Sequence, residues 1–222
     1  MPLPECYCWT RFGTEAGQSI DQILARKEQE RTANAGVFFW GIGNAIGPSM
    51  LELLRRTESP EAVFSPIRSA PRREDSRPSS IVAWTAAETL SGEEYRLPQR
   101  SLITSRLDPL NPRGRHYALV CYSESPITVR LGTEQIQFAE LRNLLTSRPV
   151  GSSQVTAVVY SNPFPRDKGI SYNVAFRVRL APPYFISLRS PVPLAPSEGC
   201  HGWAEIVGRT WDIKAGSPVP GL

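Results

Sequence analysis

Residue types that build disulfide scaffolds and hydrolytic active sites are scarce in this sequence. Its 222 residues include four cysteines and two histidines. Four cysteines in a chain of this length do not form a disulfide framework. Neither His116 nor His201 lies in a catalytic motif, since there is no GxSxG elbow, no HExxH helix and no P-loop. The sequence therefore favours a binding protein over an enzyme, and we expect no cofactor.

Long hydrophobic runs are also missing. No stretch approaches the ~20 apolar residues that a membrane-spanning helix requires. The first residues, MPLPE, lack the basic start and apolar run of a signal peptide. We therefore expect a cytoplasmic protein that makes no contact with a membrane. The hydrophobic content of 41% is enough for a core, and 222 residues fit one large domain.

Lysine is rare among the basic residues, which number 25 and include only Lys27, Lys168 and Lys214 as lysines. Dominance of arginine fits either a GC-rich genome or recognition of phosphates and carboxylates, which suits the planar guanidinium. The charge is also uneven along the chain. Residues 1–64 contain six basic and eight acidic side chains, a net charge of −2, whereas residues 142–189 contain seven basic and one acidic, a net charge of +6. A basic region of this kind attracts polyanions.

Two segments in the first quarter of the chain have helical patterns. Residues 19–31 carry apolar side chains at helical spacing, and Ser19 is the expected N-cap. Residues 48–56 begin with a proline, which suits the first turn of a helix. Between them, residues 37–43 (VFFWGIG) form a short aromatic run typical of a buried strand. The apolar face of the first helix is predicted to consist of Ile20, Ile23, Leu24 and Lys27.

The rest of the chain is predicted to contain short strands and a third helix at residues 138–145. The 21 prolines are spread along the chain, as expected for turns and strand ends. Together these elements indicate an α+β domain over residues 1–200, followed by a partly loose C-terminal extension over residues 201–222. The predicted strands are residues 62–65, 80–87, 101–105, 116–122, 155–160 and 172–180.

A glycine-rich turn, GIGNAIG at residues 41–47, lies between the predicted aromatic strand and the second helix. Nucleotide-binding glycine turns occupy such positions, but their spacing is GxGxxG and here it is GxGxxxG. Residues 62–65, about twenty residues further on, offer no acidic side chain to hold a ribose. Two interpretations stay open. In the first, the chain is a nucleotide- or cofactor-dependent enzyme that uses residues 41–47 to bind that ligand. In the second, these residues form a tight turn that allows close backbone approach beside Trp40.

The cysteines raise the question of a structural zinc site. Cys6 and Cys8 point to the same face of an extended segment, and Cys200 with His201 would complete a set of four ligands of suitable type. CxC is a weaker pattern than CxxC, and the spacing matches no known zinc finger. Ordinary thiols remain the alternative.

Three features of the sequence suit the binding of a nucleic acid. Trp40 and Trp84 each lie in a predicted strand next to small residues, where a flat ligand has room to stack. The strand at residues 172–180 alternates, with Val174, Phe176, Val178 and Leu180 on one face and Arg177 and Arg179 on the other. The loop at residues 68–77 contains four arginines and two acidic residues. Core tryptophans, a solvated strand face and an ordinary loop are the alternatives.

The order of these elements resembles the PUA-like superfamily, with the EVE, ASCH and YTH branches nearest. The resemblance rests on a helix that leads into VFFWG at residues 37–41, then a helix, then strand phrases VFSP at residues 63–66 and IVAW at residues 81–84, and basic strands beyond. It covers residues 5–190. It implies a compact pseudo-barrel of mixed and antiparallel strands, with about three helices, that binds RNA or a modified, flipped-out DNA base.

Carried onto this chain, the resemblance assigns roles to eight residues. Trp40 and Trp84 would stack on the base, and Asn44 would read its polar edge. We therefore expect a non-catalytic domain, in a bacterial setting, that recognises a modified or unpaired base in DNA or RNA. A cofactor-dependent enzyme and a protein-interaction module are the alternatives. The expected phosphate contacts are Arg68, Arg72, Arg73, Arg177 and Arg179.

Overall fold

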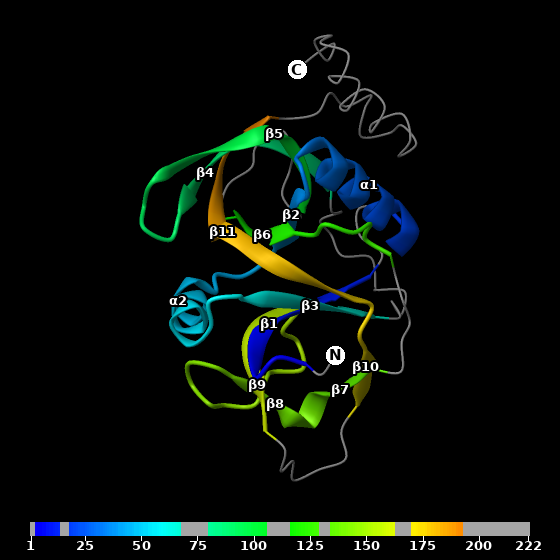
Figure 1. Cartoon of the computed structure of the whole chain (residues 1–222), viewed down its shortest axis with the longest axis vertical. Coiled ribbons are helices and arrows are strands. Elements are labelled where there is room, and N and C mark those ends of the chain that lie inside the picture. The colour runs from blue at the N-terminus through cyan, green and yellow to red at the C-terminus, as the bar shows by residue number, and fades with distance from the viewer. Residues whose placement is uncertain are drawn as a thin grey trace.

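The computed structural model describes residues 3–13, 18–67, 80–105, 116–128, 134–162 and 170–192. Over these residues the chain is a mixed α+β fold, rich in strands, with two α-helices and one large sheet that does not close on itself (Figure 1). The predicted α+β class is confirmed.

The first helix, α1 (Ile20–Ala33), begins where the sequence predicts. The Gln22 N–H donates to the Ser19 hydroxyl, and the Ser19 N–H donates to the Gln22 side chain, which completes a capping box. The second helix, α2 (Gly47–Arg56), has a proline in its first turn, as expected. In the part of the chain that the structure describes, neither helix is long and apolar enough to cross a membrane.

Five strands form the upper, curved part of the sheet, and each pair of neighbours is antiparallel. Its two end strands approach each other, with Cα atoms within 8 Å, but they are not paired. Figure 1 shows α1 alongside this part, near the labels of the two end strands. In spatial order the strands are β2 (Val37–Ile42), β6 (His116–Tyr122), β11 (Phe176–Val192), β4 (Ser80–Thr89) and β5 (Glu94–Ser105).

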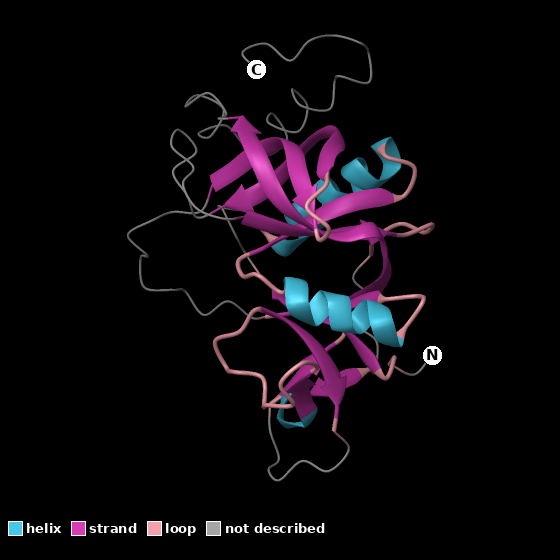
Figure 2. Cartoon of the chain, turned by 90° about the vertical axis from the view of Figure 1, so that its left-hand side faces the viewer, coloured by secondary structure: helices cyan, strands magenta, loops and turns pink. Residues whose placement is uncertain are grey.

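The lower part of the sheet continues from the first residues of β11. These pair with β3 (Glu61–Pro66), and β3 pairs in parallel with β1 (Cys6–Phe12). Beyond β1 lie β9 (Thr156–Ser161) and β8 (Leu141–Asn143), while β7 (Gln135–Gln137) and β10 (Ser171–Asn173) form a separate ribbon. Figure 2 shows α2 at the level between the upper and lower strands.

Three apolar clusters hold these layers together. The first lies between the helices and the sheet and contains Trp40 and Phe64. The second includes Phe39 and Trp84 and belongs to the curved strands. The third includes Trp9 and belongs to the lower strands and the ribbon. Successive residues of β2 alternate between the first two clusters, as the period of a strand requires.

Charged side chains of α1 bridge the gap between β2 and β5. The ammonium of Lys27 donates to the carbonyl of Phe39 in β2 and to that of Leu102 in β5, the latter at 3.2 Å. Arg26 also donates to the Leu102 carbonyl, and Glu30 accepts from Lys27 at 2.7 Å. The side chains of α1 therefore satisfy carbonyls at both unpaired edges, which would otherwise invite another strand. The predicted place of Lys27 on the inner face of this helix is confirmed, since it is buried.

Two predicted elements are wrong. The helix expected at residues 138–145 is a short 3₁₀ turn, Phe138–Glu140, followed by β8, because pairing with β9 overrides the local helical pattern. The strand expected at residues 172–180 is interrupted. Its first part is β10, and β11 starts at Phe176 and continues to Val192. Val174 accordingly lies in the third cluster, whereas Phe176, Val178 and Leu180 contact the first.

Candidate nucleic-acid interface

The two predicted stacking residues, Trp40 and Trp84, lie in the core. Trp40 is 7% exposed and meets Phe12 and Phe64 edge-on, with ring centroids 5.5 and 4.7 Å apart. Trp84 is 2% exposed, and its ring lies 5.0 Å from that of His116. The two indoles belong to different apolar clusters. Neither ring offers an open face to a base in this structure, because neighbouring side chains cover each ring and aromatic burial stabilises the core, which is the alternative that the sequence left open.

The indole N–H of Trp9 has a hydrogen-bond partner, whereas that of Trp84 has none among the described residues. Trp9 donates to the hydroxyl of Ser65 at 3.1 Å. Trp84 lies opposite Ser101 in the β4–β5 ladder, yet neither its N–H nor that hydroxyl has a hydrogen-bond partner among the described residues. Unpaired buried groups are unfavourable by about 1–3 kcal/mol each, and ordered water commonly satisfies them. Since both residues are almost fully buried, this polar gap is internal and has no open ring face for a base.

Arg177 and Arg179 lie on the same face of β11, as predicted, but the surroundings of their side chains differ. Two nitrogens of Arg177 donate to the Glu61 carboxylate at 2.8 and 3.0 Å, and a third lies 3.8 Å from Glu134. Arg179 is exposed and has no ion pair or hydrogen bond from its side chain among the described residues. Arg177 is therefore held by the fold, and Arg179 is free to contact a ligand.

Tyr122 lies directly opposite Arg179 in the β6–β11 ladder and is only half-buried. Its ring lies against the backbone of Gly36, where a Cβ would be 2.7 Å from Cε2 of the ring. Gly36 also has a φ of +98°, a conformation that favours glycine. The backbone at Gly36 therefore both permits the turn after α1 and leaves room for the tyrosine ring.

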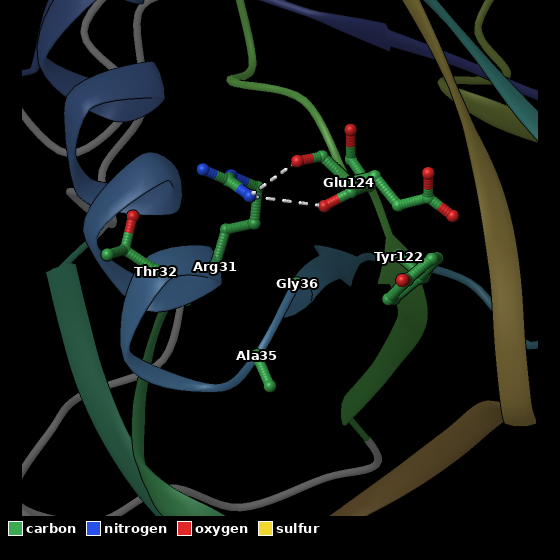
Figure 3. Close-up of a pocket in the computed structure, with 7 residues that line it drawn as sticks. Arg31, Thr32, Ala35, Gly36, Tyr122 and Glu124 are labelled. Atoms are coloured by element: carbon green, nitrogen blue, oxygen red, sulfur yellow. Dashed lines mark hydrogen bonds between the residues drawn. The ribbon is translucent and has the colours of Figure 1, made fainter.

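A surface hollow of about 350 Å³ opens beside this ring (Figure 3). We refer to it as the Gly36 hollow. It combines the C-terminal end of α1, the turn that leads into β2, and the end of β6 with the residues that follow it. Its volume is within the range of small-ligand pockets. The lining residues are Arg31, Thr32, Ala35, Gly36, Tyr122, Ser123 and Glu124.

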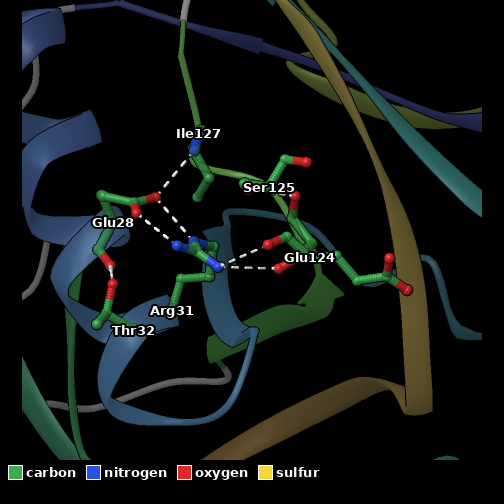
Figure 4. Close-up of polar contacts among 7 residues, drawn as sticks. Glu28, Arg31, Thr32, Glu124, Ser125 and Ile127 are labelled. Atoms are coloured by element: carbon green, nitrogen blue, oxygen red, sulfur yellow. Dashed lines mark hydrogen bonds and ion pairs between the residues drawn. The ribbon is translucent and has the colours of Figure 1, made fainter.

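Arg31 braces one wall of the Gly36 hollow. Its guanidinium donates to both oxygens of the Glu28 carboxylate, at 2.7 and 2.8 Å, and to the backbone carbonyls of Ser123 and Glu124 (Figure 4). The same carboxylate accepts from the Ile127 N–H at 2.8 Å. The hydrogen bond from Arg31 holds the pKa of the Glu28 carboxyl below its usual value. These contacts fix the segment after β6, so the charges of Arg31 and Glu28 serve the fold.

Three side chains at the end of β6 and on β11 are not used in this way. We name Tyr122, Glu124 and Arg179 the Tyr122 rim. The Glu124 carboxylate, like the Arg179 guanidinium, has no hydrogen bond or ion pair among the described residues. In Figure 3 that carboxylate and the Tyr122 ring lie on the same side of the hollow. The rim therefore combines an aromatic ring with one free anion and one free cation.

Asn44 and the turn at residues 41–47 serve packing. The Asn44 side-chain amide donates to the backbone carbonyl of Thr156 at 3.2 Å. A Cβ on Gly47 would lie 3.3 Å from Leu90, so glycine allows α2 to approach that side chain closely. A Cβ on Gly43 would meet nothing within 4 Å. Asn44 is thus tied to β9, far along the chain, and does not lie with the Tyr122 rim.

Cys6 and Cys8 point to the same side of β1, as predicted, and that side is the first apolar cluster. Burial raises the pKa of Cys8 to about 12, which disfavours the thiolate that zinc requires. Cys200 and His201 lie outside the described residues. Among the residues that the structure describes, no group of three or more His, Cys, Asp or Glu side chains is placed to hold a metal.

Arg68, Arg72 and Arg73 also lie outside the described residues. Tyr122, which lies opposite Arg179, and Glu124, which lines the same hollow as Tyr122, were not singled out by the sequence. The signal that identifies them is the pairing of β6 with β2 and β11, which places a strand end beside Gly36. That pairing joins segments about 55 to 85 residues apart, so no local pattern reveals it.

Comparisons of this chain with family models, with curated proteins and with solved structures each found no match. The function proposed below rests on the geometry of the described residues.

Proposed function

We propose that this protein is a non-catalytic nucleic-acid-binding domain that holds an unpaired base against Tyr122. The observation that carries the proposal is the Tyr122 rim: a half-buried ring beside a hollow, with a guanidinium directly across the ladder that has no partner among the described residues. Base–aromatic stacking contributes about 1–3 kcal/mol and needs only one accessible ring face. Arg179 would then contact the phosphate next to the stacked base.

We further propose that the curved strands β2, β6, β11, β4 and β5 are the pseudo-barrel of a PUA-like domain. Two features support this. The unpaired edges β2 and β5 approach each other, and the side chains of α1 bridge them through the carbonyls of Phe39 and Leu102. A helix that leads into an aromatic strand is also the order of elements on which the resemblance rests.

The basic segment at residues 142–189 is a weaker support than its net charge indicates. Arg177 is paired with Glu61 and Glu134, and Arg189 is paired with Glu88 at 2.5 Å. All three carboxylates come from outside the segment. Arg142 donates to the backbone carbonyls of Ala139 and Leu141. The proposed contact is therefore formed by Arg179 and the Tyr122 ring rather than by a broad basic surface, and a preference for single strands is expected.

The test is binding of fluorescent single-stranded and double-stranded DNA and RNA to the full chain at low salt. We expect the single strands to bind, and Tyr122→Ala to weaken that binding by roughly 5- to 100-fold, the equivalent of one lost stacking contact. Tyr122→Phe keeps the ring and should bind like the wild type. Arg148→Ala removes an exposed arginine of the same basic segment away from β6 and should have little effect. If none of the four nucleic acids binds the wild type, the proposal fails.

A further inference from the structure

We infer that the base held at the Tyr122 rim is guanine, recognised through its Watson–Crick edge by the carboxylate of Glu124. This inference rests on the proposed function. It concerns the one charged side chain of the Gly36 hollow that has no partner among the described residues.

The hollow offers few hydrogen-bond acceptors, because its own contacts use most of them. The backbone carbonyls of Ser123 and Glu124 accept from Arg31. The carbonyl of Gly36 accepts from the Ser123 N–H at 3.0 Å. The Glu28 carboxylate, behind Arg31, accepts from that guanidinium and from the Ile127 N–H. The unpaired carboxylate of Glu124 is therefore the strongest acceptor that a ligand meets there.

An ionised carboxylate only accepts hydrogen bonds, and it does so through two oxygens side by side. Guanine presents two adjacent donors on its Watson–Crick edge, N1–H and the 2-amino group, which match that spacing. Adenine and cytosine place a ring acceptor next to their amino group, and uracil and thymine flank their single N–H with two carbonyls. Each of these bases would bring an acceptor against the carboxylate and leave one oxygen desolvated without a partner. Guanine is the base that satisfies both oxygens.

Arg179 disfavours the other class of ligand that suits a ring and a carboxylate. An ammonium or guanidinium group stacked on Tyr122 would lie next to the exposed Arg179 side chain on the neighbouring strand, which has no partner among the described residues. The Arg179 guanidinium would therefore repel a cation on the Tyr122 ring. A neutral base linked to a phosphate offers hydrogen-bond donors to the Glu124 carboxylate and a negative charge to the Arg179 guanidinium. A basic peptide would be attracted by Glu124 and repelled by Arg179.

The experiment measures affinities of the full chain for oligouridine carrying one central guanine, inosine or adenine, and for plain oligouridine. Inosine lacks the 2-amino group and keeps N1–H. We expect guanine to bind about tenfold more tightly than adenine, which is the typical discrimination of one bidentate contact, with inosine between them. Glu124→Gln should abolish the preference for guanine over inosine and adenine, since an amide has one acceptor and presents a donor to the second N–H.

Other outcomes would overturn the inference in distinct ways. Equal binding of all four oligonucleotides means that the base is not read by Glu124, while the proposed function stands. A Glu124→Gln variant that tightens all four equally means that the carboxylate only repels phosphate. No binding to any oligonucleotide, together with binding of a lysine-rich peptide that Glu124→Gln abolishes, overturns both the inference and the proposed function.

Discussion

The inner face of α1 and the Tyr122 rim use charged side chains in opposite ways. On α1, Arg26, Lys27 and Glu30 are all buried. Lys27 pairs with Glu30, and Lys27 and Arg26 donate to edge carbonyls of β2 and β5. At the rim, Glu124 and Arg179 are exposed and have no partner among the described residues. Buried charges must be paired, because their desolvation is costly. Charges that the fold does not use are the ones that a ligand can meet.

The same contrast exists within a single strand. Arg177 and Arg179 are two residues apart on one face of β11, and only Arg177 is held by carboxylates. A role for a charged residue therefore follows from its neighbours in space and not from its neighbours in sequence. The variants below alter one side of this contrast at a time.

The largest effect is expected from Glu30→Gln. This change leaves Lys27 buried without its negative partner, and breaking a buried ion pair typically destabilises a protein by about 3–5 kcal/mol. Chemical denaturation of the variant measures the change in free energy of unfolding. Glu52→Gln is the matched control, since Glu52 pairs with Arg56 on the exposed side of α2 at 2.8 Å and such surface pairs contribute little to stability. Equal losses in the two variants would contradict a structural role for the α1 charges.

Gly36→Ala is expected to have the next largest effect. The substitution forces alanine into a φ of +98°, which is unfavourable by about 1–3 kcal/mol, and pushes the Tyr122 ring away. Gly92→Ala is the control. Gly92 has a φ of +84°, but a Cβ there would meet only a Glu88 oxygen at 4.0 Å. Both variants should lose stability, and only Gly36→Ala should also lose nucleic-acid binding. If both variants lose nucleic-acid binding to the same extent, displacement of the Tyr122 ring is not the cause of the loss.

A smaller effect is expected from pH. Burial lowers the pKa of Lys27 from 10.5 to about 8, with Glu30 opposing the shift. The folded chain then binds fewer protons than the unfolded chain above pH 8, so stability should rise with pH there, by less than about 1.4 kcal/mol per pH unit. Burial raises the pKa of Cys8 and Cys121 above 9.0, which reverses the trend at higher pH. Denaturation midpoints between pH 8 and 9 measure the rise. Lys27→Met should abolish it, and an unchanged rise in that variant would assign the effect to another group.

The smallest effects on stability are expected at β11. Arg177→Ala removes an ion pair that is partly buried, and a loss of about 1 kcal/mol is expected. Arg179→Ala removes an exposed side chain that has no partner in the part of the chain that the structure describes, so the free energy of unfolding should change by less than about 0.5 kcal/mol. Thermal or chemical denaturation of both variants checks the order. A larger loss in Arg179→Ala would show that its guanidinium serves the fold.

Local patterns predicted much of the framework. The helical spacing from Ile20 to Lys27 and the Ser19 cap correctly gave α1, and the aromatic run VFFWG gave β2. The run FAELRNLL has the composition of a helix, but β9 draws its middle residues into a ladder. Pairing between distant segments overrides propensity at such places, so the prediction failed there.

The candidate site was less accessible from the sequence. Trp40 and Trp84 have the neighbours of a pocket residue, and both are core residues once the strands are packed. Among the described residues of 142–189, Arg177 and Arg189 pair with Glu61 and Glu88 of neighbouring strands, which the net charge of the segment does not reveal. Tyr122 is a candidate only because the folded chain places its ring against Gly36 and opposite Arg179.

The most direct test of the contrast between committed and free charges is the salt dependence of single-strand binding. Each lost phosphate contact reduces the slope of log affinity against log salt by about 0.7 for a single strand. Arg179→Ala should lower the slope by that amount, whereas Arg177→Ala should leave it unchanged in protein that is still folded. Equal slopes for the two variants, or a loss confined to Arg177→Ala, would contradict the assignment of the Tyr122 rim as the nucleic-acid contact.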